Sequence, residues 1–237
     1  MKFIGKIIII TGASSGIGKR LKEYFGQENT VISLSRSSVY PDIACDLSDD
    51  ESINAAAEEI KKRFGKVDVL VNNAGYGLYG AAELLGDEQI EKQFSANLTG
   101  AILLTKRLLP MMSKGSKIIN VSSACALFPL PFRTMYCSSK AGLSMFSHGL
   151  KMELHPYGID VTAICPGDIK TTFTKNRVKN YSTNRRYGER ISLADEKISS
   201  REKKRMPEDY AVKKIIKIIE KKKKLWLKKN SCVPNRM

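Results

Sequence analysis

The chain has 237 residues, of which 42% are hydrophobic and 27% are charged, as in a globular protein with one buried core. No run approaches the roughly 18 apolar residues that a membrane-spanning helix needs. The five scattered cysteines form no C-x-x-C pair, and only two histidines occur, so we expect neither a disulfide framework nor a catalytic metal. Residues 1–10 are too short and too interrupted for a secretory signal, which predicts a cytoplasmic location.

The net charge of +16 is uneven, since residues 201–237 contain fourteen Lys/Arg and four Asp/Glu. The simpler interpretation is a solvated helix face followed by an edge strand whose lysines discourage pairing with other sheets. The alternative is contact with a polyanion. We expect no nucleic-acid partner and favour the first interpretation. Contact of this basic region with an anionic membrane surface stays open.

Short β-branched runs alternate with longer segments of helical period. The runs lack polar/apolar alternation, which is typical of parallel strands covered on both faces. Regular alternation of strand and helix predicts an α/β fold over residues 1–237, a single Rossmann-type domain with a doubly wound parallel sheet and helices on both faces. About seven strands are expected, at residues 7–10, 31–34, 43–46, 69–72, 118–121, 161–164 and, at the edge, 225–227.

The helical pattern predicts helices over residues 19–25, 87–109, 134–154 and 208–221. A further helix, ending near residue 64, is expected to open with a capping box of Ser48 and Glu51. Residues 168–206 are polar and charged without a clear strand. Because ligands of such sheets bind beyond the carboxyl ends of the strands, we interpret this segment as a mobile substrate-binding flap.

A glycine-rich turn, G-x-x-x-G-x-G, follows the first expected strand and opens a helix. Glycine lets the backbone approach a phosphate closely, and the helix directs its free N–H groups and positive dipole end toward it. This placement predicts a dinucleotide-binding turn. The residues expected to bind phosphate are Gly12, Ser14, Ser15, Gly16, Ile17 and Gly18.

With Thr11 included, the turn reads T-G-x-x-x-G-x-G, which resembles the short-chain dehydrogenase/reductase family, and the resemblance continues to about residue 172. It comprises N-N-A-G at 72–75 and P-G-x-x-x-T at 166–171. The resemblance implies that the first segment lines the cofactor cleft, that the second meets the nicotinamide carboxamide, and that two residues after the third strand meet the adenine. The positions implied are Asn73, Ala74, Gly75, Pro166, Gly167, Ile169, Thr171, Asp46 and Leu47.

The choice of cofactor depends on the end of the second expected strand. Family members that prefer NAD have an aspartate where this chain has Ser35, and Arg36 follows. A carboxylate there would repel a 2′-phosphate, whereas a guanidinium and a hydroxyl offer donors to it. The sequence therefore predicts NADP(H).

Tyr136 and Lys140 form Y-x-x-x-K, a spacing that puts both side chains on one helix face. A phenol has an unperturbed pKa of about 10, and a nearby ammonium would lower it toward neutrality. Ser123 precedes the tyrosine by the family's separation, and Asn97 matches its fourth member. The resemblance implies that Tyr136 is the acid/base, that Ser123 binds the substrate oxygen, that Lys140 also binds ribose, and that Asn97 holds a proton-relaying water.

These residues predict an NADP(H)-dependent oxidoreductase that interconverts a ketone or aldehyde with an alcohol. The apolar segment 124–132, with Tyr76, Leu78 and Tyr79, indicates either a hydrophobic substrate pocket or packing between subunits. The resemblance implies a homodimer or homotetramer. A non-catalytic NADP(H)-binding sensor on the same fold is the alternative, which the complete set of four catalytic residues disfavours.

Overall fold

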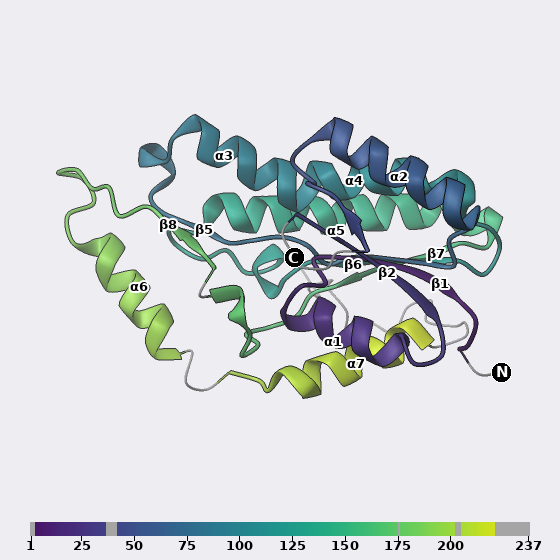
Figure 1. Cartoon of the computed structure of the whole chain (residues 1–237). Coiled ribbons are helices and arrows are strands. Elements are labelled where there is room, and N and C mark those ends of the chain that lie inside the picture. Colours follow the sequence, from purple (N-terminus) through teal and green to yellow (C-terminus); the bar gives the residue numbers. More distant parts are fainter. Residues whose placement is uncertain (1–2, 37–41, 175, 202–204, 221–237) are drawn as a thin grey trace.

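The computed structural model describes residues 3–36, 42–174, 176–201 and 205–220 (Figure 1). Six strands form one parallel sheet in the order β3-β2-β1-β4-β6-β7. The order reverses direction at β1, as in a doubly wound sheet. The strands are β1 (Ile7–Thr11), β2 (Thr30–Ser35), β3 (Ile43–Ala44), β4 (Val69–Asn72), β6 (Lys117–Val121) and β7 (Asp160–Ile164).

Helices cover both faces of this sheet. The helices of the described residues are α1 (Gly16–Phe25), α2 (Asp50–Phe64), α3 (Asp87–Phe94), α4 (Gly100–Leu108), α5 (Thr134–Leu154), α6 (Arg190–Arg201) and α7 (Glu208–Glu220), of which α6 lies away from the sheet. Ile8 and Ile10 of β1 pack with residues of α1 and α7, whereas Ile9 packs with residues of α2, α4 and α5. Figure 1 shows these two helical layers on opposite sides of the strands. The predicted α/β doubly wound architecture is confirmed.

The predicted capping box at the start of α2 is wrong. Asp49, with an extended backbone, is the N-cap, and its carboxylate accepts a hydrogen bond from the Glu51 amide at 3.0 Å. Ser48 instead donates its backbone N–H to Asp46 Oδ1 at 2.8 Å. A carboxylate accepts the free amide of a helix's first turn as well as a serine hydroxyl does and adds a favourable charge there, so Asp49 serves as the cap.

The single helix expected over residues 87–109 is interrupted. Between α3 and α4 the chain forms a π-helical turn, η2 (Ser95–Thr99), in which the Gly100 amide bonds to the Ser95 carbonyl. After α4 it tightens into a 3₁₀ turn (Leu109–Met111) that contains Pro110. Such π turns are frequently found at functional sites, and this one contains Asn97.

Residues 168–206 contain regular structure that the sequence did not indicate. The two-residue strand β8 (Val178–Lys179) pairs in parallel with β5 (Leu78–Tyr79), and α6 follows. Both ends of the segment meet at a β-bridge between Ile169 and Met206. The strand expected at residues 225–227 lies outside the described residues, so the sheet described here has six strands.

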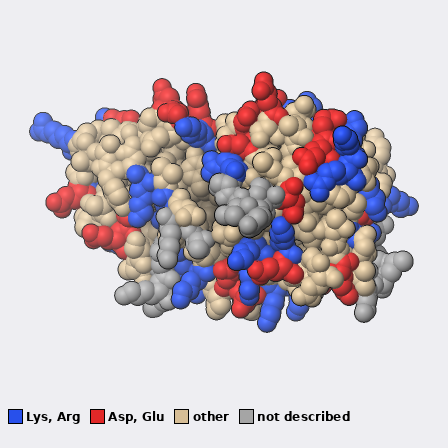
Figure 2. All heavy atoms as spheres, viewed as in Figure 1, with Lys and Arg blue, Asp and Glu red and all other residues tan. Residues whose placement is uncertain are grey.

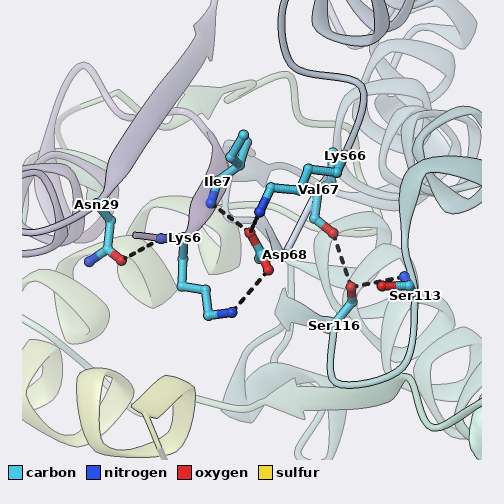
Figure 3. Close-up of polar contacts among 8 residues, drawn as sticks. All are labelled: Lys6, Ile7, Asn29, Lys66, Val67, Asp68, Ser113 and Ser116. Atoms are coloured by element: carbon cyan, nitrogen blue, oxygen red, sulfur yellow. Dashed lines mark hydrogen bonds and ion pairs between the residues drawn. The ribbon is translucent and has the colours of Figure 1, made fainter. Parts of the chain in front are cut away.

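The amino ends of the strands are held together by polar contacts (Figure 3). Asp68 accepts hydrogen bonds from the Ile7 amide at 2.9 Å and from Lys6 Nζ at 3.1 Å. Close by, Ser116 donates to the Val67 carbonyl at 3.0 Å. The opposite, carboxyl edge of the sheet is where the predicted site residues gather. No helix in the described part of the chain combines the length and apolar character needed to cross a membrane.

Candidate active site

The turn between β1 and α1 packs so closely on the N-N-A-G segment that a side chain is excluded at two of its glycines. Gly12 has φ +67°, and a Cβ there would lie 2.8 Å from Ala74 Cα. A Cβ on Gly18 would lie 2.4 Å from the Gly12 carbonyl oxygen. The N-cap Ser15 makes no side-chain hydrogen bond to the helix, and Ser14 is also exposed. The turn therefore presents free hydroxyls and the first amides of α1, which fits a bound phosphate.

Thr11 and Asn73 fasten this turn to the end of β4. Thr11 Oγ1 accepts hydrogen bonds from the Asn73 and Ala74 amides, both at 2.9 Å. Asn73 Nδ2 donates to the Thr11 and Gly12 carbonyl oxygens at 3.0 and 3.2 Å. Sequence reasoning assigned no role to Thr11, although its place at the head of the glycine motif was a usable signal.

The segment after β7 meets the same turn. A Cβ on Gly16 would lie 3.8 Å from Thr171 Cβ, so these two motifs are in contact distance although 155 positions separate them. The Pro166 carbonyl accepts the Ala124 amide at 2.8 Å, and Ile169 is buried, whereas Gly167 is exposed. The structure thus gathers the glycine turn and the P-G-x-x-x-T segment around one edge of the sheet.

The positions expected to meet adenosine lie at the ends of β2 and β3. Arg36 is 65% exposed, and its guanidinium lies 4.0 Å from Asp46 Oδ2. Ser35 is half-buried at the end of β2. Leu47 is buried against Gly100, where a Cβ would lie 2.1 Å from the Leu47 carbonyl oxygen. Arg36 is the basic group that this arrangement offers to a 2′-phosphate.

Ser123 and Tyr136 come together as predicted. Ser123 ends the connection after β6, where its Oγ accepts the Cys125 amide at 3.1 Å and caps the 3₁₀ turn η4 (Ala124–Ala126). Tyr136 lies in the first turn of α5 and is only 5% exposed. A hydrogen bond with Ser123 lowers the pKa of the phenol, so the two hydroxyls are adjacent.

The pKa of Tyr136 differs from the prediction. Burial raises it to about 12, which outweighs the effect of Ser123. The phenol is therefore protonated at neutral pH in this state, which suits a proton donor. The expected lowering by Lys140 is not seen, because its Nζ donates to the Val121 carbonyl oxygen at 2.9 Å. Burial lowers the pKa of Lys140 itself to about 8.

Asn97 holds the chain after β4 in place. Its Oδ1 accepts the Tyr76 amide at 3.0 Å, and its Nδ2 donates to the Tyr76 carbonyl at 2.9 Å. A Cβ on Gly75 would lie 2.9 Å from Asn97 Oδ1 and 3.4 Å from Lys140 Nζ. The side chain predicted to hold a proton-relaying water is thus next to the lysine, but it is already hydrogen-bonded to the backbone of Tyr76. In this arrangement Asn97 holds the N-N-A-G segment in place.

The segment 168–206 covers the site. Phe173, in the 3₁₀ turn η6 (Thr172–Thr174), packs on the Tyr136 ring with centroids 5.8 Å apart. Asp195 of α6 accepts hydrogen bonds from Lys179 Nζ at 2.6 Å and from Tyr181 Oη, and lies 3.8 Å from the buried Arg177 guanidinium. These contacts hold β8 and α6 together beyond the carboxyl edge of the sheet.

Two residues expected in a substrate pocket have another role. Leu78 and Tyr79 are 1% and 0% exposed, and Tyr79 packs with Phe132 and Ile191 in a small core beneath α6. The Tyr79 hydroxyl donates to the Ile191 carbonyl oxygen. Both apolar side chains are buried where β5 pairs with β8, so they help to hold the segment 168–206 in place.

Residues 6–182 match the sequence model of a family described as short chain dehydrogenase. The 3-ketodihydrosphingosine reductase of Bacteroides thetaiotaomicron is 36% identical over 180 residues, which are 73% of this chain and 67% of that protein. Among solved structures, the 3-ketoacyl-(acyl-carrier-protein) reductase from Brucella melitensis, complexed with NADH, has a TM-score of 0.75 at 25% identity and covers 92% of this chain and 91% of its own. L-sorbose reductase from Gluconobacter frateurii, complexed with NADPH, has a TM-score of 0.67 at 30% identity, with 72% of each chain covered. The chain belongs to the short-chain dehydrogenase/reductase family of oxidoreductases.

Proposed function

We propose that this protein is an NADP(H)-dependent oxidoreductase that interconverts a ketone or aldehyde with an alcohol on a hydrophobic substrate. The observation that carries the proposal is the meeting of the Ser123 and Tyr136 hydroxyls, one helical turn before Lys140. The Lys140 ammonium lies near Gly75 of the N-N-A-G segment, which packs on the glycine turn. The name of the Bacteroides relative, a 3-ketodihydrosphingosine reductase, supports a ketone substrate. Arg36 supports the preference for NADP(H) over NAD(H).

The residues present fit a dinucleotide. Glycines 12 and 18 let the turn pack tightly on the N-N-A-G segment, with the first amides of α1 available to a pyrophosphate. Thr171, which the family resemblance assigns to the carboxamide, lies beside Gly16. When bound, the cofactor supplies or accepts the hydride. Its proposed ligands are the residues already named at the turn, the ends of β2, β3 and β4, and the segment 166–171, together with Tyr136 and Lys140.

The proposed mechanism, written for reduction, uses two hydroxyls on one substrate oxygen. Ser123 donates a hydrogen bond to the carbonyl oxygen and stabilises the negative charge that develops there. Tyr136 gives its proton to the same oxygen as the alcohol forms. Lys140 orients the cofactor ribose, and Asn97 holds the segment that positions it. Burial of Tyr136 beneath Phe173 excludes water from this exchange.

Residues 168–206 are proposed to be the substrate-binding flap of a single NAD(P)-binding domain that spans residues 1–237. The bridge between Ile169 and Met206 joins the two ends of the segment, which supports its movement as a unit. Two exposed methionines of α5, Met145 and Met152, 71% and 73% exposed, support assembly into a homo-oligomer. We retain the cytoplasm as the proposed location.

No separate polyanion site is proposed. Basic and acidic side chains are mixed over the face in Figure 2, which argues against a single-sign patch there. Much of the basic C-terminal region predicted from the sequence, residues 221–237, lies outside the described residues.

A panel of ketones and aldehydes, followed by the absorbance of NADPH, tests the proposed function. The wild-type chain should oxidise NADPH with at least one carbonyl. Tyr136→Phe should abolish turnover and leave the Kd for NADPH within about twofold, since the proton donor is removed while the cleft is kept. Tyr157→Phe, a change on an exposed tyrosine, is the matched control and should behave as wild type. Tight NADPH binding with no turnover over a broad panel would instead favour the non-catalytic sensor.

A further inference from the structure

Arg133 is a buried cation beside the reactive phenol. It is the N-cap residue of α5, three positions before Tyr136, and is only 6% exposed. Its guanidinium carbon lies 4.9 Å from the centroid of the Tyr136 ring. This distance is within the range of a cation–π interaction, in which a positive charge is attracted to the ring face.

The charge of Arg133 lacks a carboxylate partner. Its Nε is buried without a hydrogen-bond partner, and no ion pair to its guanidinium occurs in the described part of the chain. By contrast, the buried Arg177 lies 3.8 Å from Asp195. Arginine does not lose its proton in proteins, and an unpaired buried charge is costly. A group that becomes negative during the reaction would offset that cost, and Tyr136 is in contact.

We propose that Arg133 is a positioning residue that stabilises the phenolate of Tyr136, and so sets the pH range in which this tyrosine accepts the proton of an alcohol substrate. The inference deepens the proposed function and rests on it. Lys140 is less well placed for this task, because its ammonium is directed to the Val121 carbonyl oxygen. Arg133, at the start of the same helix, contacts the ring itself.

Other groups around the phenol shift the pKa of Tyr136, some upward and some downward. Burial has the largest effect and raises the pKa of Tyr136, the nearby thiols of Cys125 and Cys137 raise it further, and Ser123 and Arg133 lower it. A hydrogen bond from Cys137, assisted by the Arg133 charge, lowers the pKa of Cys125 to about 6. Negative charge on Cys125 is therefore favoured over negative charge on Cys137, and it would oppose the effect of Arg133 on the phenol. The remaining charged groups of the surroundings are Lys140 on α5, Asp168 after β7 and Arg177 before β8.

Because these groups shift the pKa of Tyr136 in opposite directions, their removal should also shift it in opposite directions. Arg133→Met removes the cation, keeps most of the volume and disfavours phenolate. Arg133→Lys keeps the charge. Cys125→Ser removes the thiol that raises the pKa of Tyr136 and so favours phenolate.

The test is the pH profile of kcat for oxidation of an alcohol that the substrate panel identifies, between pH 6 and 10. NADP⁺ is the cofactor, and its positively charged nicotinamide would favour the phenolate and lower the pKa of Tyr136 into this range. In Arg133→Met the rise of kcat with pH should move upward by about one pH unit, so that kcat below the midpoint falls about tenfold. Arg133→Lys should restore the wild-type midpoint to within a few tenths of a unit, and Cys125→Ser should move it downward. An equal loss of kcat in Arg133→Lys and Arg133→Met, without a change in the pH midpoint, would assign Arg133 a merely structural role and overturn the proposal.

A second measurement requires no turnover. In the full chain labelled with ¹³Cζ-tyrosine and bound to NADP⁺, the Tyr136 resonance is assigned by its loss in Tyr136→Phe. Its shift toward the phenolate position should begin at higher pH in Arg133→Met than in wild type. If the panel yields no substrate but this difference is present, the proposed function fails and the role of Arg133 stands. If the resonances of the two proteins titrate alike, the inference is refuted.

Discussion

Replacement of Arg36 by alanine should change the cofactor preference of this protein. The guanidinium lies at the end of β2, is 65% exposed, and has Asp46 Oδ2 at 4.0 Å as its carboxylate neighbour. A hydrogen bond to a charged group contributes about 1.5–3 kcal/mol, and solvent screening at this exposure favours the lower end. We therefore expect a loss of about 1.4 kcal/mol, which is a tenfold rise in the Kd for NADPH.

The Kd values of both reduced cofactors are measured by titration of nicotinamide fluorescence at low and at physiological ionic strength. NADH lacks the 2′-phosphate, so its Kd should change less than twofold in Arg36→Ala. The difference between wild type and variant should shrink as salt is added. Arg63→Ala on α2, whose guanidinium bonds to Glu59 at 2.9 Å, is the control and should alter neither constant. An equal weakening of NADH and NADPH, or no weakening of either, would refute the assignment of Arg36 to the 2′-phosphate.

Two further changes test the packing of the site. Gly18→Ala places a Cβ 2.4 Å from the Gly12 carbonyl oxygen, so the free energy of unfolding in urea should fall by about 1–3 kcal/mol. Gly149→Ala is the control and should be neutral or stabilising, because a Cβ on this helical glycine would have nothing within 4 Å. Asp195→Asn should speed hydrogen exchange of β8 and α6 at pH 7, because a carboxylate that accepts from Lys179 is lost. Burial opposes ionisation of Asp195, but these hydrogen bonds keep its pKa below the usual range. Its stabilising effect is therefore present above the pKa of an unfolded aspartate, about 3.9, and is lost in wild type as pH falls through the lower folded pKa. Asp195→Asn should lack that acid dependence, and an unchanged exchange rate at pH 7 would show that the ionic contacts do not hold β8 and α6 in place.

The order of strands and helices could be read from local patterns. In runs such as Ile7–Thr11, successive side chains point to opposite faces of the sheet, and the apolar residues suit a strand that is covered on both faces. The helix over Thr134–Leu154 begins and ends where its sequence indicates. Spacing within single segments also put Tyr136 and Lys140 on one helix. These properties depend on neighbours a few residues away, so the sequence contains them explicitly.

Contacts between distant segments could not be read in this way. The pairing of β5 with β8 joins residues 100 positions apart, and neither two-residue strand has a pattern of its own. The choice of Asp49 over Ser48 as the cap of α2, and the π turn at Asn97, depend on how the backbone is held by its surroundings. Local propensity leaves such details open, and tertiary packing decides them.

By itself, the sequence determined the fold class and the family and supplied the candidates for the reactive side chains, because periodicity and motif spacing are local. Only the tertiary structure decided how buried those side chains are and which charges face them. Burial raises the pKa of Tyr136 to about 12, where the Y-x-x-x-K spacing alone predicted a lower value. Arg133, an ordinary charged residue in the sequence, becomes an unpaired buried cation against that ring. Desolvation depends on every atom packed around a group, and those atoms come from segments throughout the chain.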